Sequence, residues 1–209
     1  MPFVFCLLFV SCAPKYAAKP HREGVTLSDL LTKLNNVQSV EAVLSIDYEK
    51  NDTAMSGDAY LSVSPTMLNL RIYYLGFLAG EVKEDNGAIR SKPKLDKYKS
   101  IILVDGLKNS FMWWTIKGYD VEDKEDCYVL KNYYRKLVID KKYLLPLKQT
   151  IELDNGEELN ISYDTPAGNG QETKESLIDP EIAWYQSHMS ISYRNHRVKV
   201  TVKSFTPLL

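Results

Sequence analysis

From residue 40 onward, apolar and polar residues alternate with a period of two. Successive side chains of a β-strand point to opposite faces of a sheet, so the alternation predicts strands with one buried and one solvated face. Turn residues such as Asn51-Asp52 and Ser64-Pro65 separate the alternating segments. The pattern predicts an antiparallel meander of four strands, at residues 40–48, 55–63, 68–74 and 78–85.

A helical spacing precedes these strands. Leucines recur three and four positions apart, which places them on one face of an α-helix, and Val37 extends that face. Thr26 or Ser28 can cap the helix, and Asp29 lies in the first turn, where the helix dipole favours a negative charge. We expect an amphipathic helix whose apolar stripe is formed by Leu27, Leu30, Leu31 and Leu34.

The middle of the chain is less regular. Residues 92–99 carry four lysines and are expected to form a solvated loop. Leu107, Phe111 and Trp114 have helical spacing, so a second helix is predicted within residues 105–115. Both helices need an apolar surface to cover.

Alternation returns in the second half. The acidic run at residues 120–126 is interpreted as a solvated loop, and residues 164–176 as a polar loop; residues 178–185 are ambiguous. Asp154-Asn155-Gly156 is a strong hairpin signal. Further strands are predicted at 127–132, 136–140, 148–153, 158–163, 189–193 and 197–205.

These elements predict one domain, at residues 26–209, of the mainly β (α+β) class. Two helices and many strands with one apolar face suit a curled antiparallel sheet, or incomplete β-barrel, of about ten strands with a helical lid. Fourteen tyrosines favour such half-buried pleated surfaces.

The N-terminus reads as an export signal. Residues 2–11 carry no charge and are too few to cross a bilayer as a helix, but they fit the apolar core of a signal peptide. The order Leu8-Phe9-Val10-Ser11-Cys12 resembles a bacterial lipobox, although Phe9 stands where that pattern usually has Leu. The resemblance implies a signal at residues 1–11 and a lipid, diacylglycerol with palmitate, on Cys12. The alternative is a buried terminal strand or a short core helix.

Three further expectations concern this anchor. No basic residue precedes the apolar run, so we expect the true start to lie upstream. Residues 12–25 contain two prolines and no periodicity, and are expected to be a lipidated cysteine with a flexible tether. Ala13 follows the cysteine, where an aspartate would signal inner-membrane retention, so the expected location is the outer membrane, facing the periplasm.

Composition and motifs argue against several classes of function. Basic and acidic residues nearly cancel, at 26 against 27, so nucleic acid is not an expected partner. Only three histidines are present, and we find no metal-binding, nucleophile-elbow or phosphate-loop motif. We therefore expect no catalytic residues, no metal, no cofactor and no enzymatic activity. Cys127 is the one cysteine beyond residue 12, which excludes an intramolecular disulfide in the mature domain.

The order of these features resembles the LolA/LolB-type lipoprotein carriers. The segment Ser56-Gly57-Asp58-Ala59-Tyr60-Leu61 is similar to that family's small-residue second strand, and residues 68–80 resemble its third strand, apolar loop and fourth strand. Leu145-Pro146-Leu147-Lys148-Gln149 with the turn at 154–156 resembles its late hairpin. The family's fold is an incomplete β-barrel with a helical lid, whose cavity receives lipoprotein acyl chains.

The resemblance implies a membrane-anchored, LolB-like receptor, a chaperone-like protein that accepts lipid or lipoprotein acyl chains and passes them to the outer membrane. A periplasmic carrier protein would be a further partner. Leu75 and Phe77, in an apolar loop, would deliver cargo to the membrane, unless they fold back onto the barrel. The expected cavity lining is Leu30, Leu34, Leu44, Ile46, Leu61, Leu70, Ile72, Phe111 and Trp114.

A second hypothesis uses the same residues differently. The helix stripes can plug the barrel as core, and the sequence does not distinguish a plugged interior from a hollow one. The protein would then be a non-catalytic envelope lipoprotein with a filled core that acts as an assembly or docking subunit.

Overall fold

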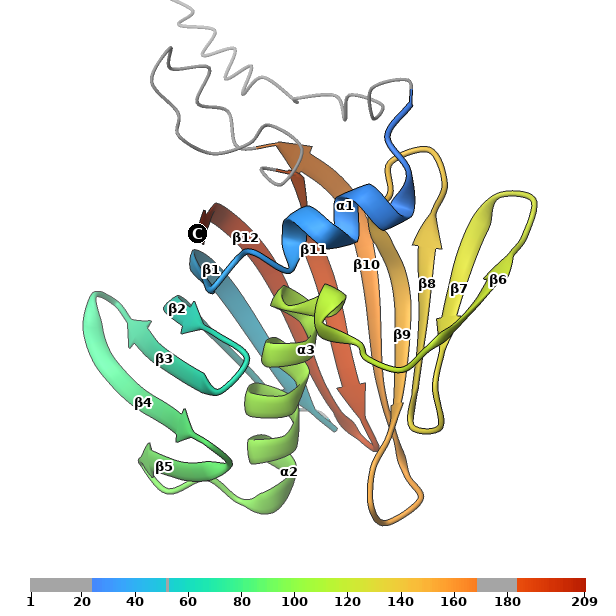
Figure 1. Cartoon of the computed structure of the whole chain (residues 1–209). Coiled ribbons are helices and arrows are strands. Elements are labelled where there is room, and N and C mark those ends of the chain that lie inside the picture. The colour runs from blue at the N-terminus through green and yellow to red at the C-terminus, as the bar shows by residue number, and fades with distance from the viewer. Residues whose placement is uncertain (1–23, 52, 169–183) are drawn as a thin grey trace, which may run out of the picture.

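The computed structural model describes residues 24–51, 53–168 and 184–209. In these ranges twelve strands form one antiparallel sheet, in the order β5-β4-β3-β2-β1-β12-β11-β10-β9-β8-β7-β6 (Figure 1). The strands are β1 (Ser39–Lys50), β2 (Thr53–Val63), β3 (Met67–Tyr74), β4 (Phe77–Asp85), β5 (Ala88–Lys92), β6 (Asp120–Asp123), β7 (Cys127–Lys131), β8 (Arg135–Asp140), β9 (Pro146–Glu152), β10 (Glu158–Gly168), β11 (Trp184–Tyr193) and β12 (His196–Leu208). The expected signal peptide at residues 1–11, Cys12 and most of the expected tether lie outside the described residues.

The fold class predicted from the sequence is confirmed. β5 and β6, at the two ends of the sheet, do not pair with each other, so the barrel is incomplete. The meander of four strands is present as β1–β4. The first and last parts of the chain are joined in the middle of the sheet. There β1 pairs with β12 along its whole length, from Ser39 opposite Leu208 to Lys50 opposite His196.

The first helix is present where the leucine spacing predicted it. α1 (Leu27–Leu34) buries all four leucines of the stripe. Thr26 caps it, because its hydroxyl accepts a hydrogen bond from the Asp29 amide at 3.2 Å and its own amide donates to the Asp29 carboxylate at 3.2 Å. This reciprocal capping box satisfies two amides that the helix leaves unpaired.

The second helix begins earlier than predicted. α2 (Lys97–Ser100), a π-helical turn η1 (Ile101–Gly106) and α3 (Leu107–Phe111) form one continuous helix, followed by the 3-10 turn η2 (Trp113–Thr115). The expected loop at 92–99 is therefore wrong in its second half. Asp96 explains the early start, because its side chain accepts from the Lys99 amide at 2.8 Å and caps the helix.

Two strands were not predicted. β5 and β6 are edge strands, and all four residues of β6 are exposed, as are most residues of β5. A strand without a buried face has no apolar alternation to detect. The solvated loop expected at 120–126 is thus wrong for Asp120–Asp123, although its acidic side chains do face solvent.

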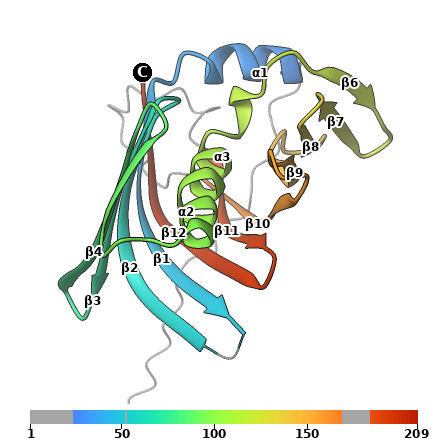
Figure 2. The same cartoon turned by 90° about the horizontal axis from the view of Figure 1, so that it is seen from below.

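The sheet curls around the second helix, and α1 lies across one end of the resulting trough (Figure 2). Buried and exposed residues alternate along β12 and β1, so the concave face is apolar. The helix lies very close to this face at Gly106. A Cβ atom added there would lie 2.6 Å from Cγ2 of Ile191 on β11, which is closer than real Cβ contacts allow. Glycine at this position permits the helix to lie directly on the sheet.

Candidate functional site

A small apolar pocket lies where the two helices meet the concave face. α1 contributes Leu30 and Leu34, α3 contributes Phe111, and the other walls come from β9–β12 and adjoining residues. The free space amounts to about 20 Å³, which has room for about one water molecule. The pocket is thus nearly closed by the helices that cover it.

The structure places the nine predicted lining residues in two groups. Those from the helices come together at the pocket: Leu30, Leu34, Phe111 and Trp114. Those from the early strands lie in the core, away from this pocket, four of them buried and Ile72 half-buried: Leu44, Ile46, Leu61, Leu70 and Ile72.

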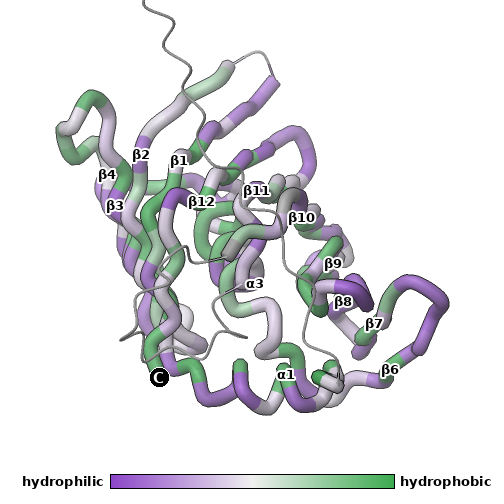
Figure 3. The backbone as a smooth tube through the Cα atoms, turned by 90° about the horizontal axis from the view of Figure 1, so that it is seen from above, coloured by the Kyte–Doolittle hydropathy of each residue, from purple (hydrophilic) through white to green (hydrophobic). Residues whose placement is uncertain are grey.

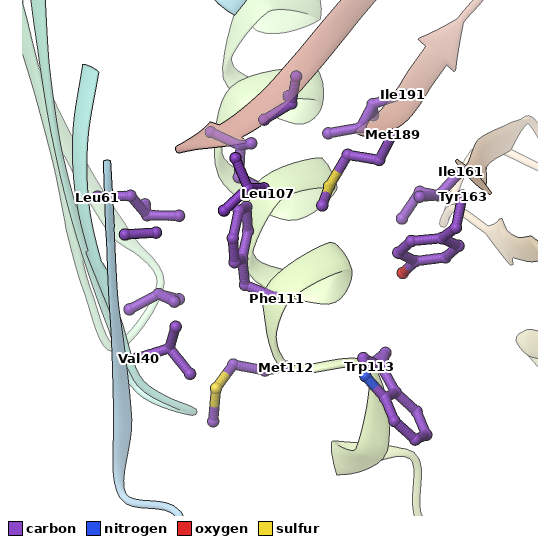
Figure 4. Packing of buried hydrophobic residues seen from close by; sticks show 14 of the residues in the cluster. Val40, Leu61, Leu107, Phe111, Met112, Trp113, Ile161, Tyr163, Met189 and Ile191 are labelled. Carbon is purple, nitrogen blue, oxygen red and sulfur yellow. The ribbon is translucent and has the colours of Figure 1, made fainter. Parts of the chain in front are cut away.

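Residues of the last strands complete the pocket, and the sequence analysis did not assign them to it. Met189 and Tyr185 on β11 and Phe205 on β12 line the wall opposite α1. The Phe205 ring stacks between Tyr185, at 5.0 Å between centroids, and Phe111, at 6.5 Å. Figure 4 shows Phe111 pointing from α3 into the space between the early strands and Met189. The alternation at 189–205 was the signal that could have identified this inward face.

The side chain of Gln186 in the pocket wall is only partly satisfied by hydrogen bonds among the described residues. Gln186 donates from Nε2 to the carbonyl oxygen of Pro146 at 2.9 Å, which fixes the orientation of its amide. Its Oε1 is buried and has no hydrogen-bond partner among the described residues. An unsatisfied buried acceptor costs about 1–3 kcal/mol. The pocket wall therefore contains, beside its apolar side chains, one buried acceptor that is unpaired among the described residues.

A buried polar cluster fixes the C-terminal end of the second helix. Arg135 on β8 donates to the Trp113 carbonyl at 3.0 Å and to Oε1 of Gln149 at 2.8 Å. Gln149 in turn donates to the Asn109 carbonyl at 2.9 Å. Tyr163 on β10 donates to the Ser110 carbonyl at 3.3 Å and also contacts Gln149. These bonds satisfy carbonyls that a helix end leaves unpaired.

This cluster buries the positive charge of Arg135. Arg135 is 3% exposed, and burial lowers the pKa of its guanidinium. Burial likewise raises the pKa of the Tyr163 hydroxyl. None of the ion pairs in the described ranges involves Arg135, so carbonyl and amide oxygens alone balance its charge. Cations are favoured at a helix C-terminus, and this arrangement uses that preference in a buried setting. The sequence signal was a polar residue on the inward face that Arg135 shares with Leu137 and Ile139.

The N-terminal end of the same helix is fixed by an aromatic and ionic cluster. The ring of Tyr98 stacks on His196 at 5.4 Å, and the Tyr98 hydroxyl accepts from Nη1 of Arg194 at 2.8 Å. Arg194 Nε donates to both carboxylate oxygens of Glu157, at 2.7 and 2.9 Å. His196 is buried and its Nδ1 lies 2.5 Å from the Tyr48 hydroxyl. This cluster ties the helix to β1, β12 and the β9–β10 turn.

The loop between β3 and β4 is apolar and exposed, at the sheet end away from α1. Leu75 is 80% exposed and Phe77 78% exposed, and Tyr74 and Leu78 beside them are also exposed. We call Tyr74–Leu78 the apolar tip. Figure 3 shows it as a hydrophobic loop that projects from the hydrophilic strands around it. The alternative that Leu75 and Phe77 fold back onto the barrel is not what the structure has.

The conformation of the apolar tip adds to the cost of its exposure. Leu75 and Gly76 have φ angles of 50° and 82°, as in a two-residue type I′ hairpin turn. Asn, Asp or Gly is the usual first residue of such a turn, and a leucine with positive φ is strained. The chain therefore holds a leucine at a strained and largely exposed position, where a polar residue would be more stable.

Two kinds of feature are absent from residues 24–51, 53–168 and 184–209. Within these ranges no group of three histidine, cysteine or acidic side chains is placed to hold a metal ion. No helix in the same ranges is long and apolar enough to cross a membrane.

Comparison with known proteins identifies solved structures that have a similar fold. No family model and no curated protein sequence matches the chain. A LolA superfamily protein from Nitrosomonas europaea has a similar structure, with a TM-score of 0.53 and 11% identity over 88% of this chain and 94% of that one. A putative outer membrane lipoprotein-sorting protein domain from Vibrio parahaemolyticus gives a TM-score of 0.52 and 9% identity over 87% and 90%. The chain therefore has the fold of the LolA superfamily, as the sequence resemblance predicted.

Because of the cluster at the N-terminal end of the second helix, the free energy of unfolding depends on pH in the acid range. The Arg194 guanidinium, and then the Tyr193 hydroxyl, lower the pKa of Glu157 from its ordinary 4.5 to about 2. Because the folded-state pKa is the lower one, the stabilisation is present above pH 4.5 and is lost as the pH falls toward 2. Glu157→Gln should lower the melting temperature at neutral pH and flatten its decline between those pH values. Glu158→Gln, at an exposed neighbour, is the control; equal profiles for both variants would contradict the assignment.

Proposed function

We propose that this protein is a lipid or lipoprotein carrier of the bacterial envelope. It accepts acyl chains between its helices and the concave sheet, as a LolB-like receptor supplied by a periplasmic carrier protein, and passes them to the outer membrane. The role is one of binding and transfer, without catalysis. Two solved structures of the same fold support it, since one is described as a LolA superfamily protein and the other as a putative lipoprotein-sorting domain.

The observation that carries the proposal is Leu75. Both its positive φ and its 80% exposure oppose stability, and the usual Asn, Asp or Gly would make the same turn between β3 and β4 at lower cost. Strain and exposed apolar surface that persist at one residue point to a function there. A leucine and a phenylalanine exposed at the end of a hairpin are suited to entering the apolar layer of a membrane, where a carried acyl chain must be delivered.

Loading requires the helices to move. A space of about 20 Å³ cannot hold an acyl chain, so α1 or the second helix must leave its place. α1 is the better candidate, because polar clusters fix both ends of the second helix, whereas α1 faces the pocket with Leu30 and Leu34. Each buried CH2 group of the ligand then contributes about 0.8 kcal/mol, which offsets the lost helix packing.

A second function is favoured by the small size of the pocket. If the helices never leave the concave face, the core is filled and the protein is an assembly or docking subunit of an envelope complex. The apolar tip would then contact a protein. The two functions differ in whether the purified protein carries or binds lipid, which native mass spectrometry and lipid extraction measure directly.

Acyl binding should depend on the pocket face of α1. Leu34 lines the pocket, whereas Leu31 is equally buried on the same helix but does not. Leu34→Gln and Leu31→Gln should destabilise the protein by similar amounts, on the order of 2–4 kcal/mol. Only Leu34→Gln should also weaken binding of a fluorescent fatty acid, by about tenfold. No binding to the unaltered protein, together with no extractable lipid, would favour the filled-core function.

Transfer should depend on the apolar tip. Leu75→Asn with Phe77→Thr replaces exposed apolar groups by residues that suit the turn and strand, so stability should stay within about 1 kcal/mol or rise. Fatty-acid binding should persist, and transfer from protein to phospholipid vesicles should fall at least tenfold. Met55→Ser with Val121→Ser, at exposed positions outside the tip, is the matched control. A tip variant that transfers normally refutes the delivery role.

We further propose that Cys12 carries the lipid that anchors the protein in the outer membrane. The apolar run ending at Ser11-Cys12 supports this, and Ala13 supports the outer over the inner membrane. Cys12→Ala should leave the signal unprocessed or release the protein from the outer-membrane fraction. The measurement is density-gradient fractionation with mass analysis of the N-terminus. A variant that is cleaved normally and still fractionates with outer membranes would exclude the anchor.

A further inference from the structure

Basic side chains gather next to the apolar tip. Positions 90–99 hold five basic residues against one acidic residue, in a chain whose net charge is −1. Three of them, which we call the basic cluster, are exposed on β5 and the loop that follows it: Arg90, Lys92 and Lys94. This local excess of charge contrasts with the balance of the whole chain.

The sheet register places the basic cluster beside the β3–β4 hairpin, a few residues along the strand from the apolar tip. Lys92 lies opposite Glu81 on β4, four positions from Phe77, which is about 13 Å of strand. The loop then passes under Gly80, since the Lys92 carbonyl oxygen and Cδ of Pro93 lie 3.4 and 3.6 Å from where a Cβ atom of Gly80 would be. Exposed cations therefore flank the same hairpin that ends in the apolar tip.

The described residues do not neutralise these cations. Within the part of the chain that the structure describes, Arg90, Lys92 and Lys94 form no ion pair. Glu81, directly opposite Lys92, is already shared by Arg71 at 3.2 Å and Lys83 at 3.1 Å. Arg90 also lies directly opposite Lys83 across β4 and β5, and like charges so placed repel one another. An anionic partner on this face would relieve that repulsion.

We propose that the basic cluster binds anionic phospholipid headgroups while the apolar tip enters the same bilayer. The inference rests on the delivery role proposed for the tip and names the membrane chemistry that it meets. Apolar groups enter a bilayer by about 5–10 Å, and electrostatic attraction to anionic lipids adds to that binding. Entry of this depth brings Lys92 to within about one Debye length, 8 Å, of the phosphate plane. The apolar tip would thus contact the apolar layer of the membrane, and the basic cluster its anionic headgroups.

Vesicle flotation with residues 12–209 carrying Cys12→Ala tests the proposal, because neither an attached lipid nor the apolar run at residues 2–11 then contributes. The vesicles are phosphatidylcholine alone or with about 30 mol% phosphatidylglycerol. Binding should be at least about tenfold tighter to the anionic vesicles, and this preference should disappear as NaCl rises from about 0.05 to about 0.5 M. Equal binding to both compositions, or binding that salt does not weaken, overturns the proposal.

Matched charge variants locate the effect. Arg90→Gln, Lys92→Gln and Lys94→Gln together should remove most of the anionic preference and leave binding to neutral vesicles unchanged. The control neutralises three exposed lysines on distant strands, Lys131→Gln, Lys136→Gln and Lys148→Gln, of which Lys131 and Lys136 are likewise directly opposed. Melting temperatures identify any variant that does not fold. An equal loss with the control set shows that overall charge is responsible and overturns the proposal.

The tip variant separates this proposal from the function on which it rests. If Leu75→Asn with Phe77→Thr transfers cargo normally while the cluster variant loses its anionic preference, the delivery role fails and headgroup binding stands. If the tip variant loses transfer and the cluster variant keeps the full preference, the delivery role stands and headgroup binding fails.

Discussion

The contact between Gly106 and Ile191 sets the geometry on which the other features depend. A curled sheet has a concave apolar face that must be covered, and a helix can cover it only by lying directly on it. At Gly106 there is no room for a Cβ atom, so the backbone of the helix lies as close to the Ile191 side chain as atomic contact allows. The depth of the helix in the trough then decides where Phe111 projects, how much space remains against α1, and which carbonyls Arg135 can reach.

The second helix is held in two physically different ways. Its middle packs through apolar contacts, which are non-directional and adjust to small shifts. Its ends are held by directional bonds, at Arg135 and Tyr163 on one side and at Tyr98 and Arg194 on the other. A buried arginine without an acidic partner is costly to leave unsatisfied, so displacing the C-terminal end would require breaking several bonds at once. α1 is held at the pocket by the apolar contacts of its leucine stripe. The second helix is therefore the more firmly fixed of the two helices that cover the concave face.

Much of this architecture could be predicted because burial leaves a periodic trace in the sequence. The leucine stripe of α1 and the alternation of β1–β4 were both correctly located. β5 and β6 left no such trace because neither strand has a buried face, and α2 was missed because a lysine-rich turn does not look apolar. The pocket was harder still. Phe205 and Met189 have the same alternating pattern as ordinary core residues, and only tertiary packing shows that they meet Phe111 beneath α1.

The pairing of β1 with β12 has a consequence for how the chain acquires its structure. These neighbours in the middle of the sheet are separated by some 150 positions in sequence, so contacts between them carry a high entropic cost of loop closure. Until residues 196–208 have left the ribosome, β1 has an unpaired edge and neither half of the sheet can be joined to the other. Assembly is therefore a late and slow event. Until the last strand is available, the two halves of the sheet cannot share one core, and the concave face stays incomplete.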